Sequence, residues 1–151
     1  MGSKINKLLL KDKKNYHAVV LDDMADENNF LNKTAEVLKN GCEVLEFDGI
    51  NLNSKNYLAV SKKLRDLCGV FNALLIIKDR IDMAKLSGAD GIVLDKNSIS
   101  PQEAHKLTEN HLLLGYHLHD EIIPAKKDLD ILDFIIGKEG INCDIKQFFR
   151  N

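Results

Sequence analysis

The chain has few cysteines and no close spacing among them. Only Cys42, Cys68 and Cys143 are present in 151 residues, and no two of them form a Cys-x-x-Cys pair. Disulfide frameworks and structural zinc sites use even or closely spaced sets of cysteines. We therefore expect separate thiols in a reducing compartment and, by default, a cytoplasmic protein.

Long apolar runs and an excess of charge of one sign are also missing. No run approaches the roughly 18 apolar residues that a membrane span needs, and residues 8–10 are too short for the core of a signal peptide. The formal net charge is −2, which supplies no basic surface for nucleic acid. We expect neither a membrane nor nucleic acid as a partner.

Short apolar runs instead alternate with helical segments. The clearest unit predicts a buried strand at 73–77, a short helix at 81–87 that Gly88 ends, and a second buried strand at 91–94. An acid follows each of these strands. In parallel α/β folds ligands bind at the carboxyl ends of the strands, so we expect the site at this edge.

The same alternation extends over residues 16–137 and follows a polar arm at 1–14. The tail at 138–151 is predicted to contain a turn at 138–142 and a short closing helix at 145–149. We expect one α/β domain of residues 1–151 with about six parallel strands joined by helices. The pattern leaves open whether these strands form a doubly wound sheet or a barrel wall. Further strands are predicted at 18–21, 44–47, 112–115 and 132–137. Helices are predicted at 26–40, at 54–68 with Ser54 as the candidate cap, and at 101–110, and a short segment at 125–129 precedes the last strand.

Two local signals stand out in this pattern. Residues 41–47 and 88–94 occupy the same place in the repeat, where a helix stop leads into a buried strand. Ser100 followed by Pro101 and Glu103 is typical of a capping box with proline at the first helical position. Both signals favour a regular repeat of one strand and one helix.

Residues 74–107, LLIIKDRIDMAKLSGADGIVLDKNSISPQEAHKL, resemble the middle of the thiamine phosphate synthase and thiazole tautomerase superfamily. Its members carry an Asn-Asp-Arg turn, a G-A-D-G-V-H-L-G-Q segment and a later strand that ends in I-G-V-S-T-H, which is similar to residues 114–119. The resemblance covers about residues 16–120 and implies a (β/α)₈ barrel. A complete barrel takes about 250 residues, so we expect an incomplete, TIM-barrel-like wall, opened or completed by oligomerisation.

The resemblance also assigns candidate site residues. Glu46, Asp48 and Ile50 stand where the synthase has the Gln, Arg and Lys that hold pyrophosphate. Two acids and an aliphatic side chain would repel pyrophosphate, which argues against the synthase reaction itself. Glu46 and Asp48 remain candidates for substrate binding.

Asp79 and Arg80 match the last two residues of the Asn-Asp-Arg turn, with Lys78 in place of the asparagine. The resemblance implies a magnesium ion at Asp79 and a phosphate at Arg80. The alternative is an ion pair that only shapes the turn. The second magnesium-binding acid of the family falls at Ser98, and His117 replaces a serine that contacts phosphate, so His117 is also a substrate-binding candidate.

His119 matches the histidine that the thiazole tautomerase branch uses as its acid and base. An imidazole at the end of a strand can titrate near neutral pH and move a proton. Its alternative role is a hydrogen-bonded structural one. His117 and His119 also have the spacing that places two rings on one side of a strand, as metal ligands can be.

Two functions follow from these residues. The first is a divergent synthase-like protein of thiamine biosynthesis that binds a phosphorylated thiazole or pyrimidine with magnesium and transfers protons at His119. The second is a non-catalytic homologue that binds a ligand or partner through the same edge; in either case we expect a homo-oligomer. A third interpretation, a receiver-like signalling domain, rests on Asp22 and Asp23 with Asp79 as the phosphoryl acceptor. It also needs a lysine after the fifth strand, and Lys126 lies too far into a helix for that part.

Overall fold

The computed structural model describes residues 10, 13–108, 111–118, 124–138 and 140–143. Its strands form one seven-stranded sheet whose spatial order, β1 to β7, is also the order along the chain. The first six strands are parallel, and β7 runs antiparallel to β6. The strands are β1 (Tyr16–Val20), β2 (Val44–Asp48), β3 (Leu74–Lys78), β4 (Gly91–Leu94), β5 (Leu113–His117), β6 (Phe134–Gly137) and β7 (Gly140–Asn142).

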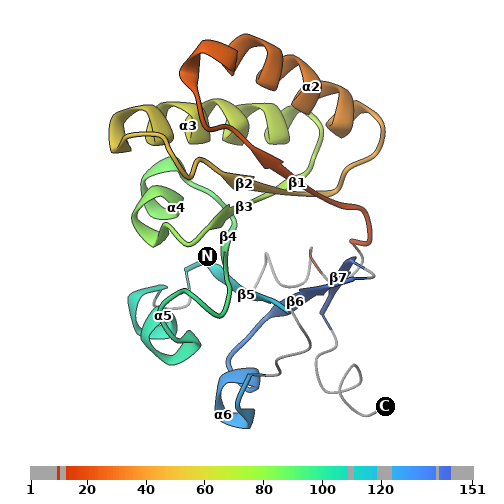
Figure 1. Cartoon of the computed structure of the whole chain (residues 1–151). Helices are drawn as coiled ribbons and strands as arrows, with labels where there is room; N and C mark the ends of the chain where they lie inside the picture. The colour runs from red at the N-terminus through yellow and green to blue at the C-terminus, as the bar shows by residue number, and fades with distance from the viewer. Residues whose placement is uncertain (1–9, 11–12, 109–110, 119–123, 139, 144–151) are drawn as a thin grey trace.

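Helices connect the parallel strands and cover the outer side of the curved sheet (Figure 1). They are η1 (Met24–Asp26), α2 (Glu27–Lys39), α3 (Ser54–Val70), α4 (Ile81–Ser87), α5 (Pro101–Thr108) and α6 (Lys126–Leu129). The result is a nearly closed, TIM-barrel-like wall, as the sequence predicts. The sequential strand order contradicts the receiver-like alternative, because doubly wound receiver folds reverse their strand order.

The helix ends follow the local signals. Gly88 adopts φ +74° after α4 and so ends that helix in the left-handed region. The Ser100 hydroxyl accepts a hydrogen bond from the Glu103 amide at 3.2 Å, which confirms the capping box at α5. At α3 the cap is Asn53, whose side chain accepts from the Asn56 amide, and the suggested cap Ser54 is already helical.

The repeated segments before β2 and β4 share a hydrogen-bonding device. Glu43 Oε1 accepts from the Asn15 amide at 3.2 Å, and Asp90 Oδ2 accepts from the Leu75 amide at 2.8 Å. Asp133, just before β6, accepts from the Leu114 amide at 2.9 Å in the same way. In each case a carboxylate just before β2, β4 or β6 accepts a hydrogen bond from a backbone amide at or just before the neighbouring strand β1, β3 or β5. The repeat in the sequence therefore marks a repeated link between neighbouring strands.

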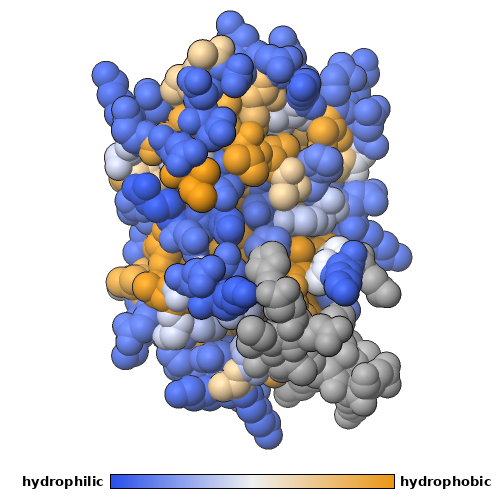
Figure 2. Space-filling view, in the orientation of Figure 1, coloured by the Kyte–Doolittle hydropathy of each residue, from blue (hydrophilic) through white to orange (hydrophobic). Residues whose placement is uncertain are grey.

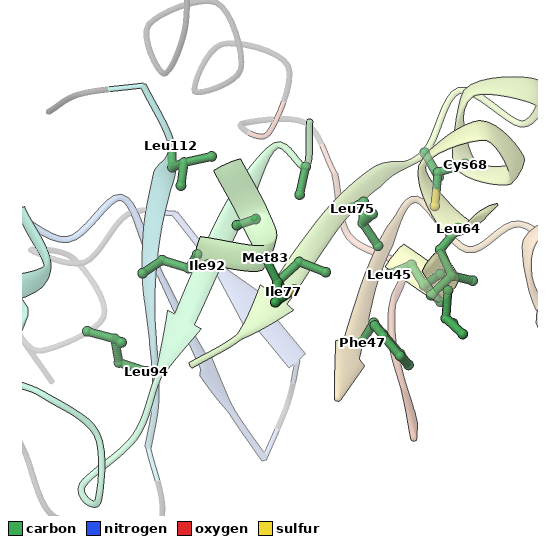
Figure 3. Close-up of a cluster of buried hydrophobic side chains, with 14 of the residues drawn as sticks. Leu45, Phe47, Leu64, Cys68, Leu75, Ile77, Met83, Ile92, Leu94 and Leu112 are labelled. Carbon is green, nitrogen blue, oxygen red and sulfur yellow. The ribbon is translucent and has the colours of Figure 1, made fainter. Parts of the chain in front are cut away.

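Alternate residues of each strand face opposite sides of the sheet and form two cores. On the outer side, strand residues such as Leu45, Ile77 and Ile92 pack against Leu64 of α3 and Met83 of α4 (Figure 3). Burying one such side chain contributes about 1.5–3 kcal/mol, so this layer holds the helices on the sheet. The inner core is made by Leu10, Val44, Leu74, Ile76, Val93, Leu113, Phe134 and Ile136.

Two predictions for the last third of the chain have different outcomes. The segment 138–142 was predicted as a turn, and it instead contains β7, which adds an antiparallel strand to the sheet. The predicted closing helix at 145–149 lies outside the described residues. The boundaries of the arm, the repeats and the tail within residues 1–151 stay predictions.

The helices, the surface and the cysteines of the described residues bear directly on the expectations from the sequence. None of the helices there is long and apolar enough to cross a membrane. Hydrophobic and hydrophilic side chains are interspersed on the face seen in Figure 2. Cys42 and Cys68 are buried free thiols, and burial raises the pKa of the Cys68 thiol to about 12, which keeps it protonated.

Candidate functional site

Three polar side chains meet inside the barrel wall. Tyr16 comes from β1, Glu46 from β2 and His117 from β5. Glu46 lies on the same strand face as Val44, and His117 on the same face as Leu113, so both point into the inner core. We call these three residues the interior cluster.

The interior cluster is centred on one carboxylate oxygen. The Tyr16 hydroxyl donates to Glu46 Oε1, and His117 Nε2 lies 2.5 Å from the same oxygen. Tyr16 Oη lies 3.4 Å from His117 Nε2, with the two rings in an edge-on arrangement. Burial raises the pKa of Tyr16 above its ordinary range, and the Glu46 charge raises it further, so the phenol stays protonated and acts as a donor.

A second group of charges lies nearer the carboxyl ends of the strands. Lys78 Nζ is 3.3 Å from Asp95 Oδ2 and 3.9 Å from Asp48 Oδ2. We call these three residues the mouth cluster. Burial works against a charged Lys78, but Asp95 and Asp48 together raise its pKa. The lysine is therefore a fixed cation between two carboxylates.

The two acids of the mouth cluster respond differently to their surroundings. Burial is the largest influence on Asp48 and raises its pKa; Lys78 opposes this shift, whereas the charges of Glu46, Asp79 and Asp95 add to it. Burial also disfavours ionised Asp95, but the Asn97 amide and Lys78 outweigh it and lower the pKa of Asp95. Asp95, whose ionised form is favoured and which lies closer to Lys78, is therefore the stronger ion-pair partner of the lysine.

Asp79 follows β3 in a left-handed backbone conformation, φ +62°, which is uncommon outside glycine. Its amide donates to the Val93 carbonyl at 3.0 Å, and its carboxylate accepts from the Ser98 hydroxyl. Ser98 Oγ in turn accepts from the Asp95 amide at 2.9 Å. The turn thus brings Asp79 next to the mouth cluster through a serine.

These donors do not by themselves fit the magnesium ion that the family implies. Ser98 stands beside Asp79 where the family has a second acid. No group of three or more His, Cys, Asp or Glu side chains in the described ranges could hold a metal ion. Magnesium prefers several oxygen ligands in octahedral geometry, and one exposed carboxylate with a serine falls short of that. Metal binding at Asp79 stays a prediction.

Arg80 is engaged away from Asp79. Its guanidinium donates to Asp82 through two nitrogens, at 3.0 and 2.9 Å, and lies 5.3 Å from the centre of the Tyr57 ring. The pair at the turn is therefore Arg80 with Asp82, not Arg80 with Asp79. The hydrogen bond from Arg80 lowers the pKa of Asp82, so the pair is held at neutral pH.

The structure joins some of the predicted residues and separates others. Glu46 and His117 are in direct contact, and Asp48 lies beside Lys78, while His119 is outside the described residues and its acid–base role stays a prediction. Sequence reasoning missed Tyr16 because it began the first strand at residue 18. The available signal was the alternation of a strand, which places Tyr16 on the same inward face as Ala18, two positions later.

Comparison with known proteins places this arrangement in a family. The sequence model of the thiamine monophosphate synthase family matches residues 17–136. The chain belongs to this family. It is 27% identical over 117 residues to a thiamine-phosphate synthase of Campylobacter jejuni, covering 78% of this chain and 52% of that protein.

Other members of the thiamine monophosphate synthase family give the same relation. The chain is 28% identical over 112 residues to the thiamine-phosphate synthase of Clostridium perfringens, covering 73% of this chain and 54% of that one. A solved thiamine phosphate pyrophosphorylase from Pyrococcus furiosus superposes with a TM-score of 0.69 at 21% identity over 85% of this chain and 61% of its own. That likeness shows the fold. The chain spans about half the length of the curated relatives it matches.

Proposed function

We propose that this chain is a divergent member of the thiamine monophosphate synthase family, linked to thiamine biosynthesis in the cytoplasm. It binds a phosphorylated thiazole or pyrimidine at the carboxyl ends of its strands. It moves a proton on that ligand and does not couple the two halves of thiamine. The mouth cluster is the observation that carries this proposal.

The charges of the mouth explain why coupling is lost. Coupling needs donors that hold a pyrophosphate, and the inward face of β2 offers Glu46 and Asp48 in their place. Lys78, between Asp48 and Asp95, is already neutralised by the two carboxylates. Two like charges 4 Å apart near a protein surface repel by about 4 kcal/mol. A pyrophosphate at this position would meet that repulsion from more than one side.

A ligand with a single phosphate meets less electrostatic repulsion, because its phosphate can bind at Arg80, away from these acids. The Arg80 side chain is 36% exposed at the same edge of the barrel, where a phosphate can compete with Asp82 for its guanidinium. A ligand held there extends its ring over the mouth cluster towards the interior cluster. This placement gives Arg80 the phosphate and leaves the ring to the polar side chains of the barrel.

The proposal is tested by calorimetry and a coupling assay on the whole chain. We expect thiazole phosphate to bind, the pyrimidine pyrophosphate to bind at least tenfold more weakly, and no thiamine phosphate to form from the two, with or without magnesium. Arg80→Met should abolish thiazole phosphate binding, while Lys85→Met, an exposed lysine on α4, serves as the matched control. Thiamine phosphate formation at the rate of a working synthase would refute the proposal.

A gain-of-function variant tests the electrostatic reason separately. The double substitution Asp48→Arg and Ile50→Lys places one cation at the end of β2 and one in the loop after it, where Ile50 is already exposed. We expect pyrimidine pyrophosphate binding to strengthen by tenfold or more, because one repulsive charge is removed and two attractive ones are added. If affinity stays unchanged, the acids of β2 do not set the ligand preference.

A non-catalytic binding protein is the second candidate, and the ends of the sheet favour it. In the described residues β1 pairs only with β2, and β7 pairs only with β6. Unpaired strand edges are places where another chain can add on. We propose a homo-oligomer that uses these edges, and sedimentation of the whole chain at several concentrations tests it. A monomer at all concentrations would exclude it.

A further inference from the structure

We propose that the interior cluster of Tyr16, Glu46 and His117 is an acid–base site that exchanges a proton with a heteroaromatic ring held at the barrel mouth. This inference rests on the proposed function, because the ring is the one proposed to bind there. It assigns the proton transfer to His117 and Glu46, whereas the family resemblance assigned it to His119.

The position of the interior cluster in the sheet is the first argument. β2 and β5 are separated by β3 and β4, so the contact between Glu46 and His117 crosses the inside of the wall. Backbone hydrogen bonds already join neighbouring strands, and the sheet does not need this contact for its pairing. An imidazole and a carboxylate that meet across the interior are therefore placed for a task other than strand pairing.

Burial is the second argument. The side chain of Glu46 is 6% exposed and that of His117 is 13% exposed. Around them the inner core is apolar, with Val44, Ile76 and Val93 among its members. Burying a carboxylate in such surroundings costs stability unless it is paired, and apolar residues of similar size would pack there at no such cost. Paired polar groups kept at that cost in a site are candidates for chemistry.

The geometry gives each member a role. Glu46 Oε1 accepts from the Tyr16 hydroxyl and, in the tautomer with a proton on Nε2, from His117 as well. A carboxylate in this position fixes the ring orientation of a histidine and stabilises the imidazolium that forms when the ring takes a proton. Tyr16 is a positioning residue, because its phenol stays protonated and holds the carboxylate in place.

The step is balanced within the ligand and the imidazole. The imidazole of His117 takes the proton from a ring carbon that lies next to a nitrogen, and the electron pair of the broken C–H bond stays on that carbon as a lone pair. The imidazolium, paired with Glu46, then returns a proton to the same carbon, and in D₂O this is a deuteron once the imidazolium has exchanged with solvent. No electrons or atoms are gained or lost, so the ligand leaves with only its ring hydrogen exchanged. A ring with an acidic C–H bond next to a nitrogen, such as a thiazole, is the class that fits.

Other titratable groups face this site and shape its pH dependence. Lys78 from β3, Asp48 from β2 and Asp95 from β4 form the mouth cluster just above it. The pH profile of proton exchange will therefore report the interior and mouth clusters together, and single variants are needed to separate them.

The experiment follows ring protons by NMR in D₂O, with thiazole phosphate as the probe and its affinity measured by calorimetry on the same whole-chain samples. We expect Glu46→Gln and His117→Gln each to slow exchange by about 100-fold or more, the usual contribution of a placed acid or base. Their affinity for the probe should change less than threefold. His111→Gln, an exposed histidine, is the matched control, and Tyr16→Phe should shift the pH profile. His117→Asn is the second variant if His117→Gln does not fold.

Each outcome decides one of the two proposals. Exchange that survives in Glu46→Gln and His117→Gln, or that is lost only in His119→Ala, overturns the assignment to the interior cluster. Binding of the probe without any exchange in the unaltered protein overturns this inference and leaves the proposed function standing. Absence of both binding and exchange overturns both.

Discussion

Gly115 offers the sharpest test of the barrel interior. It faces the ring of Phe134 on β6, and a Cβ atom added to Gly115 would lie 2.1 Å from the Cε2 and Cζ atoms of that ring. Ordinary carbon contacts are about 3.5–4.0 Å, so the ring must move by more than an ångström. Phe134 is fully buried, and the ring has little room to yield. Gly115→Ala should therefore strain the interior layer below His117.

The magnitude is the difference between two effects. Overpacking a well-packed core costs about 1–3 kcal/mol. Against this, alanine reduces the freedom of the unfolded chain and contributes about 0.4–1 kcal/mol to stability. We expect the free energy of unfolding to fall by about 1–2 kcal/mol, since the clash exceeds the entropy gain. The Tm should fall by about 2–4 °C for each kcal/mol in a chain of this size.

Urea denaturation measured by fluorescence and circular dichroism on the same samples tests this expectation. Gly69→Ala in α3 is the matched control, because nothing lies within 4 Å of its added Cβ. It should leave stability unchanged or raise it by up to about 1 kcal/mol. Phe134→Leu combined with Gly115→Ala should recover part of the loss, since the two residues touch. If both glycine variants behave alike, the packing argument is wrong.

Two further changes test the ends of the elements. Ser100→Ala removes the cap of α5 and should cost about 1 kcal/mol, read from urea denaturation. Lys106→Ala, an exposed position on the same helix, is its control, and an equal loss in both variants contradicts the capping role. Burial raises the pKa of Asp90, so the folded protein favours the protonated carboxyl group. The free energy of unfolding should therefore fall as the pH rises above the ordinary pKa of an aspartate, because the buried group must then ionise. Asp90→Asn keeps an acceptor for the Leu75 amide, and we expect its stability relative to the unaltered protein to increase from pH 4 upwards. Asp130→Asn, an exposed position, should show no such trend in the same titration.

The interior and mouth clusters suggest how a family member can change chemistry without changing its fold. Glu46 and Asp48 occupy one face of β2, two residues apart, and the same backbone would present two donors if those side chains were amide and guanidinium. In this chain Asp48 forms an ion pair with Lys78, and Glu46 forms a hydrogen bond with His117. Under the proposed function, these acids replace the binding of an anion by the transfer of a proton.

The sequence by itself determined the repeat of strand and helix, most element ends and the family. These features depend on neighbours along the chain: apolar runs for buried strands, Gly88 after α4, and Ser100 before Pro101. The fold class followed from them because consecutive parallel strands joined by helices have few arrangements. The strand β7 escaped notice because three residues of weak pattern carry no local signal.

Only the tertiary structure decided which side chains meet. Tyr16 and Glu46 are 30 positions apart and Tyr16 and His117 are 101 positions apart, yet they share one oxygen inside the wall. Contacts of this kind depend on register and on the curvature of the sheet, because a shift of one residue turns a side chain to the other face. The same holds for Lys78, whose place between Asp48 and Asp95 required three strand ends at one edge. The sequence named most of the residues of the site, and the barrel wall decided their partners.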